Sequence, residues 1–341
     1  MRIALSNRLY FPVVGGTPVL TYSLAKAFAS HGHEVFLITA TAGGEADPGD
    51  GFKLIRQPSK RELLDVADYV DVLLQIEVSI SLLWPFLLRG KPWFVSHQTH
   101  FGETWLSSLQ REITRFGTPT SISDCVYETW GKRGVIVPNP YDETVFKFGT
   151  EPKRQELLFV GRLLEAKGLM ELLQALAILK GKNLTPHLQV IGDEVENGIS
   201  VIPAFQKRTQ ELGIADQVTF AGARNQKDVA EEMMRSRILV VPSRWVEPFG
   251  IVALEGLASG CVVVASEQGG LREAVGSFGH FFKNGDAESL AGVLSNVLKN
   301  LDHLKPDPAA LKTHLSHHTS DAIARQYEAL FEKKIPHFVT R

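Results

Sequence analysis

The stretch ILVVPSRWVEPFGIVALE, residues 238–255, contains the pattern from which the fold is predicted. Its first part, Ile238–Pro242, is a short apolar run typical of a buried strand. Pro248 disfavours helical geometry at the residue before it, so we expect Glu247 to lie in a loop. Glu255 then falls in the helix that follows. A strand, a loop and a helix in this order are typical of parallel sheets with crossover helices.

The same alternation recurs along all 341 residues, with further strand candidates at Glu34–Thr39 and Trp93–His97. The length predicts two domains, and the alternation predicts an α/β fold of two doubly wound, Rossmann-like sheets that face each other across a cleft. Pro, Asn, Asp and Gly interrupt the periodicity at residues 137–142 and 147–152, where we expect the linker. The expected domains are 1–150 and 151–318, with a helix in 319–341 that packs on one of them.

Composition and charge describe an ordinary globular protein, with 44% hydrophobic and 22% charged residues. The formal net charge of -2 leaves no basic excess, which argues against a nucleic-acid binder that works by counterion release. The N-terminal stretch MRIALSNRLYF lacks the apolar run of a secretory signal, and Asp71, Glu77 and Pro85 interrupt the longest apolar region. We therefore expect a cytoplasmic protein, and peripheral contact with the inner membrane surface stays open.

Two cations follow the first strand of the second half, in VGRLLEAKG, residues 160–168. Ligands of open α/β sheets bind beyond the carboxyl ends of the strands, where such loops gather. The fork of Arg162 and the point charge of Lys167 would suit a pyrophosphate. Solvated surface charge is the alternative, and it is favoured on these two residues alone.

Two glutamates, Glu247 and Glu255, flank the start of the helix at Gly250 and Ile251. The free N–H groups at a helix start favour a phosphate, whereas an ionised carboxylate only accepts hydrogen bonds. Because sugars present neighbouring hydroxyl donors, we interpret the glutamates as groups that hold two sugars on either side of a diphosphate. The alternative is a glutamate pair that complements the helix dipole.

Two glycine pairs and one histidine complete the candidate loops. Gly15-Gly16 precedes a helix that we expect to be capped at Thr17-Pro18 and closed by Gly32, and Gly269-Gly270 precedes another helix. His97 ends a predicted strand and would reach the cleft. A plain turn and a structural histidine are the respective alternatives. The sequence contains no common metal, hydrolase or P-loop motif.

Taken in order, these loops resemble the retaining glycosyltransferases of family 4 (glycosyl transferases group 1), which have the GT-B fold. The most specific part is EPFGIVALE, residues 247–255, which is similar to the family's pair of glutamates separated by seven residues. VGRLLEAKG, Gly15-Gly16, HGHEV at 31–35 and EQGGLREAV at 267–275 support the resemblance.

The resemblance implies a role for each matching residue. Arg162 and Lys167 would bind the donor diphosphate, Glu255 the ribose, and Glu247 the transferred sugar. His97 would be the active-site histidine, with His100 as the alternative, so that the catalytic set is His97, Glu247, Arg162 and Lys167. The remaining donor-site residues would be Gly15, Gly16, Gly222, Arg224, Phe249, Gly250, Ile251 and Gly270.

The implied function is retaining transfer of a hexose-type sugar from a nucleotide sugar to a hydroxyl group. UDP sugars are the commonest expectation, with GDP and ADP sugars open, and the acceptor is a sugar, a lipid-linked sugar or a small molecule. We expect no cofactor and no metal, because protein cations would stabilise the leaving diphosphate. A nucleotide-sugar 2-epimerase-like enzyme and a binding-only relative with a retained donor site are the alternatives.

Overall fold

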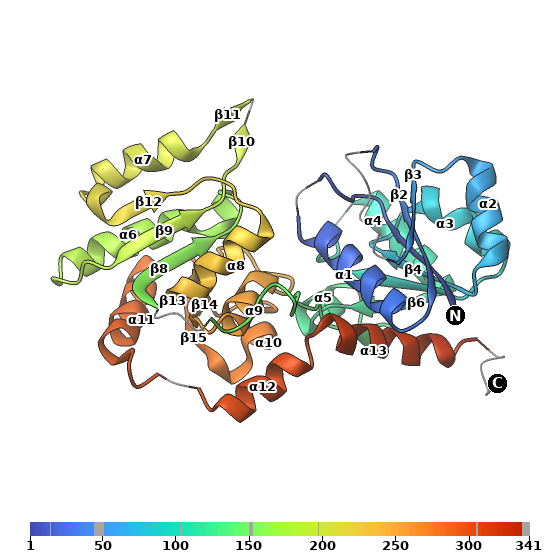
Figure 1. The fold of residues 1–341 in the computed structure, drawn as a ribbon. Helices are drawn as coiled ribbons and strands as arrows, with labels where there is room; N and C mark the ends of the chain where they lie inside the picture. The colour runs from blue at the N-terminus through green and yellow to red at the C-terminus, as the bar shows by residue number, and fades with distance from the viewer. Residues whose placement is uncertain are drawn as a thin grey trace. The chain divides into compact units, whose positions relative to one another are not determined.

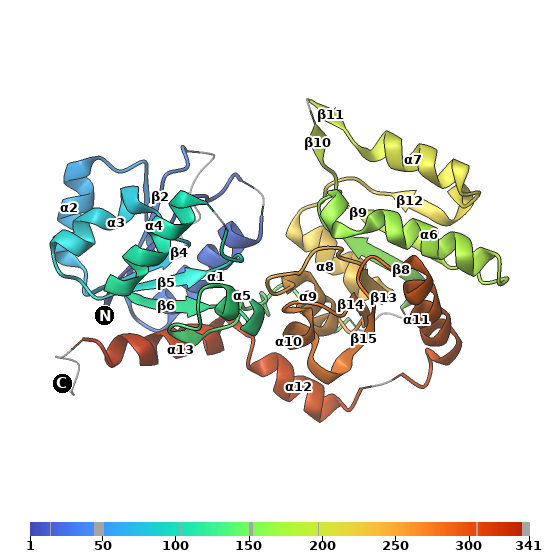
Figure 2. The same cartoon turned by 180° about the vertical axis from the view of Figure 1, so that it is seen from behind.

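The computed structural model describes residues 1–13, 15–43, 51–102, 104–149, 153–196, 198–304 and 306–335. The chain divides into two compact units (Figures 1 and 2). The first unit comprises Met1–Tyr141 and Ser316–Arg341, and the second comprises Asp142–Leu315. Each unit is built on a parallel sheet, so the predicted α/β class with two doubly wound sheets is confirmed.

The first unit has a seven-stranded sheet in the order β3-β2-β1-β4-β5-β6-β7. Apolar side chains alternate between its two faces, with α1 and α13 packed on one face and α2 and α3 on the other (Figure 1). Its strands are β1 (Arg2–Asn7), β2 (Glu34–Thr39), β3 (Lys53–Arg56), β4 (Val72–Ile76), β5 (Trp93–His97), β6 (Thr118–Ser121) and β7 (Val135–Ile136). Its helices are α1 (Gly16–Ser30), α2 (Lys60–Tyr69), α3 (Ile80–Leu88), α4 (Trp105–Ile113), α5 (Asp124–Thr129) and α13 (Ser320–Glu332).

Helix α1 begins one residue before the predicted cap. Gly15, in extended backbone, is the N-cap, and Thr17 already belongs to the first turn. The Thr17 carbonyl accepts hydrogen bonds from Asn7 Nδ2 at 3.2 Å and from Thr21 Oγ1 at 2.7 Å, which holds this turn against β1. Gly32, with φ of 80°, follows the helix end as predicted.

The C-terminal helix α13 packs on the first unit. The ring of Phe331 lies against Phe28 of α1 and Phe94 of β5, with centroids 5.9 and 4.9 Å apart. The hydroxyl oxygens of Tyr327 and Thr120 lie 3.2 Å apart. These buried contacts explain why the chain returns to the first unit after completing the second; residues 336–341 of the expected segment lie outside the described residues.

The boundaries of the units differ from those expected at 150 and 318. The first boundary falls after Tyr141, because the Tyr141 N–H donates to the His318 carbonyl at 3.0 Å, whereas Phe148 lies beside Gly260 of the second unit. The chain rejoins the first unit at Ser316. Residues 150–152 of the expected linker lie outside the described residues.

The second unit has a six-stranded sheet in the order β12-β9-β8-β13-β14-β15. Helices α6 and α11 share one apolar cluster with it (Figure 2). Its strands are β8 (Arg154–Val160), β9 (His187–Ile191), β12 (Val218–Phe220), β13 (Ser236–Val241), β14 (Val262–Ser266) and β15 (Gly279–Phe282), with a separate hairpin of β10 (Val195–Glu196) and β11 (Ile199–Ser200). Its helices are α6 (Leu169–Lys180), α7 (Ile202–Glu211), α8 (Gln226–Arg235), α9 (Ile251–Ala258), α10 (Leu271–Val275), α11 (Ala287–Asn300) and α12 (Pro308–Ser316), with short 3-10 turns including η2 (Glu165–Lys167).

Two features of the second unit were not predicted. β15 is only four residues long, and the strands of the hairpin have two residues each, too few for a recognisable alternation. In the part of the chain that the structure describes, none of the helices combines the length and the apolar character needed to cross a membrane.

We expect Gly168→Ala to destabilise the protein strongly. Gly168 has φ of +72°, and a Cβ atom there would lie 1.7 Å from the Pro242 carbonyl oxygen. The left-handed conformation alone costs alanine about 1–2 kcal/mol, and the clash adds to it, so the free energy of unfolding should fall by more than about 2 kcal/mol. Gly213→Ala is the matched control, because φ is +65° there and no atom lies within 4 Å. Equal losses for the two variants in urea denaturation would contradict the clash.

Candidate donor site of the second unit

The candidate site lies where the strand order of the second sheet reverses. β8 pairs with β9 on one side and with β13 on the other, although β13 comes much later in the chain. Open α/β sheets bind ligands at such a switch point, beyond the carboxyl ends of the strands. The loops 161–168 and 242–250 both start there, and they carry the predicted cations and Glu247.

Lys167 and Glu247 join these two loops. Lys167 Nζ donates to Glu247 Oε1 at 2.6 Å, and Ser243 Oγ donates to the same oxygen at 2.7 Å. Glu247 is 6% exposed, and the Lys167 ammonium also lies 5.1 Å from the ring centroid of Trp245. A buried carboxylate with two charge-assisted hydrogen bonds is held in one orientation. The structure therefore brings these two predicted residues into contact.

Arg162 has a different carboxylate partner. Its Nε donates to Glu194 Oε2 at 2.7 Å, and this hydrogen bond lowers the pKa of Glu194. Arg162 is 63% exposed at its side chain, so the pair is accessible to solvent. Glu194 follows β9 and leads into the hairpin β10–β11. The two predicted cations thus lie on one loop without sharing a partner.

Close backbone packing explains why glycines occupy positions 269 and 270, after β14. The Gly270 N–H donates to the Glu247 carbonyl at 2.8 Å. A Cβ atom on Gly269 would lie 2.4 Å from the Glu247 carbonyl oxygen, and one on Gly270 would lie 2.4 Å from the Pro248 carbonyl oxygen. Only glycine permits this approach. The pair consequently places the loop after β14 against the backbone of Glu247.

Helix α9 follows directly from the same loop. Gly250 is its N-cap with φ of 96°, Phe249 before it is buried, and Ile251 is its first residue. Glu255, half-buried on this helix, has no hydrogen-bond or ion-pair partner among the described residues. Burial, with a smaller contribution from the charge of Asp142, raises the pKa of Glu255 to about 8. Near neutral pH its carboxyl group is therefore mainly protonated, and it both donates and accepts hydrogen bonds.

Arg244 was not predicted, yet it links the two loops a second time. Its side chain pairs with Glu165 of η2 and with the buried Glu171 of α6, at 3.1 Å for the latter. Its N–H donates to the Ala166 carbonyl at 2.9 Å. No local pattern signals this residue, because its partners lie far away in sequence.

The two residues expected beside a nucleotide base lie after β12. The Gly222 carbonyl accepts a hydrogen bond from the Gly192 N–H at 2.9 Å, which ties this loop to the loop after β9. Arg224 is exposed and has no ion-pair partner in the described part of the chain. Among the described residues, no group of three or more His, Cys, Asp or Glu side chains is placed to hold a metal ion.

The remaining predicted residues belong to the first unit. Gly15 and Gly16 begin α1, and His97 ends β5. His97 is stacked on Trp130 with centroids 3.6 Å apart, and neither ring nitrogen has a hydrogen-bond partner. Burial lowers the pKa of His97 to about 3, so its imidazole is neutral near pH 7. His100 lies in the loop that follows and is half-buried.

Glu77, at the end of β4, is a further residue that sequence reasoning missed. It has φ of 57°, an uncommon conformation for glutamate, and burial raises its pKa to about 7. Its Oε1 accepts hydrogen bonds from the Gln98 N–H at 2.7 Å and from Thr99 Oγ1 at 3.0 Å. Glu77 therefore holds the loop that carries His97 and His100.

Comparison with known proteins identifies a family for part of the chain. Residues 141–307 match the family model of glycosyl transferases group 1. The alpha-maltose-1-phosphate synthase of Mycobacterium tuberculosis is 31% identical over 196 residues, which cover 53% of this chain and 46% of that protein. The chain thus spans about half the length of the curated relatives it matches.

Solved structures share the fold over nearly the whole chain. The sucrose-phosphate synthase of Thermosynechococcus elongatus has a TM-score of 0.78 at 18% identity and covers 98% of both chains. Anabaena Alr3699/HepE in complex with UDP has a TM-score of 0.79 at 16% identity, over 98% of this chain and 100% of that one. These likenesses confirm the predicted GT-B fold, and the family match confirms a resemblance to glycosyl transferases group 1 for residues 141–307.

Removal of the Lys167 ammonium should destabilise the second unit. In Lys167→Met the buried Glu247 carboxylate loses its counter-charge, so we expect the free energy of unfolding to fall by about 1–3 kcal/mol. Lys180→Met is the control, because it removes an ion pair with Asp216 that is mostly exposed. It should lower the free energy of unfolding by less than about 1 kcal/mol. Urea denaturation at pH 7 measures both, and a loss no greater in Lys167→Met than in the control would contradict a structural role for the pair.

The raised pKa of Glu255 predicts a dependence of stability on pH. The pKa of Glu255 is about 8 in the folded protein against 4.5 for the free side chain. Between these two pH values the folded state therefore keeps a proton that the unfolded state has lost. Stability contributed at this position therefore falls as pH rises from about 4.5 to about 8. Glu255→Gln removes this titration. The melting temperature of the variant minus that of the parent protein should therefore increase as the pH is raised from 5 to 8. A constant difference across this range would assign Glu255 an ordinary pKa.

Proposed function

Starting from the match of residues 141–307 to the glycosyl transferases group 1, we propose that this protein is a retaining glycosyltransferase of family 4. It transfers a hexose from a nucleotide sugar to a hydroxyl group of an acceptor. The observation that carries the proposal is the Lys167–Glu247 pair at the switch point of the second sheet. It places a cation for a phosphate and an acceptor of sugar hydrogen bonds on adjoining loops.

Bond cleavage at the anomeric carbon leaves negative charge on the departing diphosphate. Lys167 and Arg162 stabilise this charge, together with the N–H groups at the start of α9, and preorganised donors of this kind contribute several kcal/mol in other enzymes. Lys167 is held in place by Glu247 and Trp245, whereas Arg162, whose own side chain is largely exposed, must exchange its partner Glu194 for the phosphate. Glu247 accepts hydrogen bonds from hydroxyl groups of the transferred sugar, near the backbone of Phe249 to Ile251.

Glu255 holds the ribose in this proposal. Its half-buried carboxyl group has no protein partner among the described residues, and a protonated carboxyl both donates and accepts. A pair of ribose hydroxyls matches this capacity. Gly222 and Arg224, after β12, flank the base, and Gly270 supports the diphosphate side through its contact with the loop of Glu247.

We assign a UDP sugar as donor, because one solved structure with the same fold contains UDP and another of the same protein contains UDP-glucose. The acceptor belongs to the first unit, near the starts of α1 and the loop after β5, with Gly15 and Gly16 close to it. His97 acts there as a neutral hydrogen-bonding group, with His100 as the alternative. A lipid-linked acceptor would bring the protein to the inner membrane surface, and a soluble acceptor would leave it in the cytoplasm.

Calorimetric titration with UDP, GDP and ADP, without added metal, tests the donor site. We expect UDP to bind and Arg162→Ala to weaken its binding about tenfold, or about 1.4 kcal/mol, as for a hydrogen bond between charged groups. Arg208→Ala removes a similar exposed pair, with Glu211 on α7, and should leave the affinity unchanged. Glu194→Gln should tighten UDP binding a few-fold, because the phosphate then competes with a neutral side chain.

Binding of none of the three nucleotides would overturn the donor assignment. The alternatives separate at the next step, when UDP-glucose is supplied with a panel of hydroxyl acceptors. A transferase releases UDP and glycosylates an acceptor, a 2-epimerase-like enzyme acts on the nucleotide sugar without one, and a binding-only relative releases nothing.

A further inference from the structure

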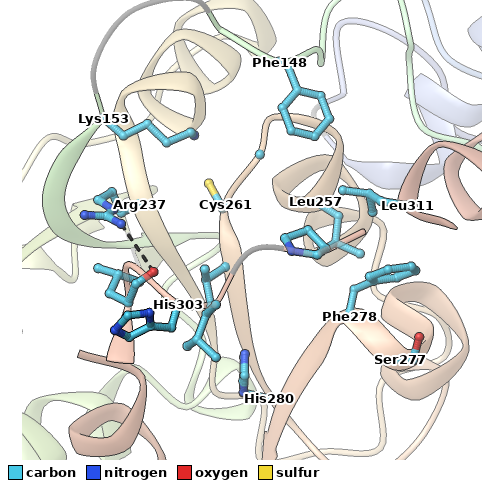
Figure 3. Close-up of a pocket in the computed structure, with 15 residues that line it drawn as sticks. Phe148, Lys153, Arg237, Leu257, Cys261, Ser277, Phe278, His280, His303 and Leu311 are labelled. Carbon is cyan, nitrogen blue, oxygen red and sulfur yellow. Dashed lines mark hydrogen bonds between the residues drawn. The ribbon is translucent and has the colours of Figure 1, made fainter. Parts of the chain in front are cut away.

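The second unit contains a cavity of about 390 Å³ that the proposed function does not use. It lies at the amino ends of three neighbouring strands, where Arg237 is the second residue of β13, Val262 the first of β14 and His280 the second of β15. The loops of the candidate donor site follow the opposite, carboxyl ends of the strands. The cavity is therefore a separate place on the same sheet. Figure 3 shows the residues that line it.

Large apolar side chains form much of the cavity wall. Phe278, Leu257 and Leu311 line it, and Phe148 stands at its edge (Figure 3). Phe148 is 58% exposed, which is unusual for a phenylalanine. A Cβ atom at position 260 would lie 2.8 Å from the Phe148 ring, so Gly260 leaves space for the ring.

The polar groups that line the cavity are neutral or cationic, and none of the fifteen lining residues is acidic. Arg237 Nη2 donates to the Leu301 carbonyl at 3.4 Å and to Asp302 at 2.9 Å, which fixes its guanidinium (Figure 3). Lys153 Nζ donates to three backbone carbonyls at 2.8–3.0 Å, so its N–H groups are already engaged.

Two imidazoles provide further hydrogen-bonding capacity, beside the Arg237 N–H groups that its own hydrogen bonds leave unused. His280 and His303 line the cavity, and neither ring has a hydrogen-bond partner among the described residues. His280 is half-buried, and burial lowers its pKa. His303 is exposed, so in the absence of a ligand solvent can satisfy both rings, and each can hydrogen-bond a ligand in place of solvent. The Cys261 thiol, by contrast, donates to the Met233 carbonyl at 3.1 Å, and burial raises its pKa to about 11, so covalent chemistry at this thiol is not favoured.

We propose that this cavity is a second ligand-binding site, which takes a small amphiphilic anion. The apolar or aromatic body of the ligand packs on Phe148, Leu257 and Phe278, and its anionic group is directed at His280, His303 and Arg237. A volume of this size, an apolar wall and a few convergent polar groups are typical of small-molecule sites. The proposal does not depend on the proposed glycosyltransferase activity, because it uses none of the donor-site residues.

Fluorescence titration with 8-anilinonaphthalene-1-sulfonate, an aromatic anion, tests the site on the full chain. His303→Glu places a negative charge on an exposed position of the lining, and Phe148→Ala removes the exposed ring; neither change touches the core. We expect each to weaken binding about tenfold, with unchanged melting temperatures. The matched controls are His317→Glu and Phe116→Ala, which alter an exposed histidine and an exposed phenylalanine of the first unit, and both should bind as the parent does.

Two further titrations separate the alternatives. Saturating UDP should leave the affinity for the probe unchanged, and displacement by UDP would place the probe at the donor loops and overturn the proposal. The uncharged analogue N-phenyl-1-naphthylamine should bind about tenfold more weakly than the anion. Equal affinities of the two probes, or equal effects of the lining variants and their controls, would also overturn it.

Discussion

The close approach of three loops is the constraint on which the candidate site depends. Gly168 lets the loop after β8 lie against the Pro242 carbonyl, and Gly269 and Gly270 let the loop after β14 lie against Glu247 and Pro248. A side chain at any of these positions would push the loops apart. Lys167 reaches Glu247 only because the backbones are this close, so the ion pair follows from the packing of glycines.

The two cations of the site, Lys167 and Arg162, differ in how firmly their carboxylate partners hold them in place. Lys167 pairs with a buried carboxylate that also accepts from Ser243, and a buried pair of this kind is costly to break. Arg162, whose side chain is largely exposed, pairs with Glu194, and an ion pair that solvent can reach contributes little. A diphosphate would therefore meet one fixed cation and one that changes partner. Under the proposed function, this division would let a site satisfied by its own carboxylates accept an anion.

Local patterns predicted the elements that depend on local chemistry. The strands β2 and β5 were predicted to the residue, because each is an apolar run with clear ends. The loop position of Glu247, the start of α9 at Gly250 and Ile251, and the helical position of Glu255 follow from Pro248 and Gly250. β15 and the hairpin β10–β11 were missed since their strands are too short to show a period. Glu194 and Arg244 were missed because Arg162 lies 32 residues before the former and Glu165 lies 79 residues before the latter.

By itself the sequence determined the α/β class, the division into two sheets and the loops that carry Arg162, Lys167 and Glu247, because strand length, helix period and proline geometry act over a few neighbouring residues. Tertiary structure alone decided the partner of each charge, the return of α13 to the first unit and the cavity at the amino ends of β13, β14 and β15. It also decided that Glu255 is half-buried with a raised pKa. The physical reason is that burial and pairing depend on distances between segments remote in the chain, and these distances are set only when the sheet has assembled.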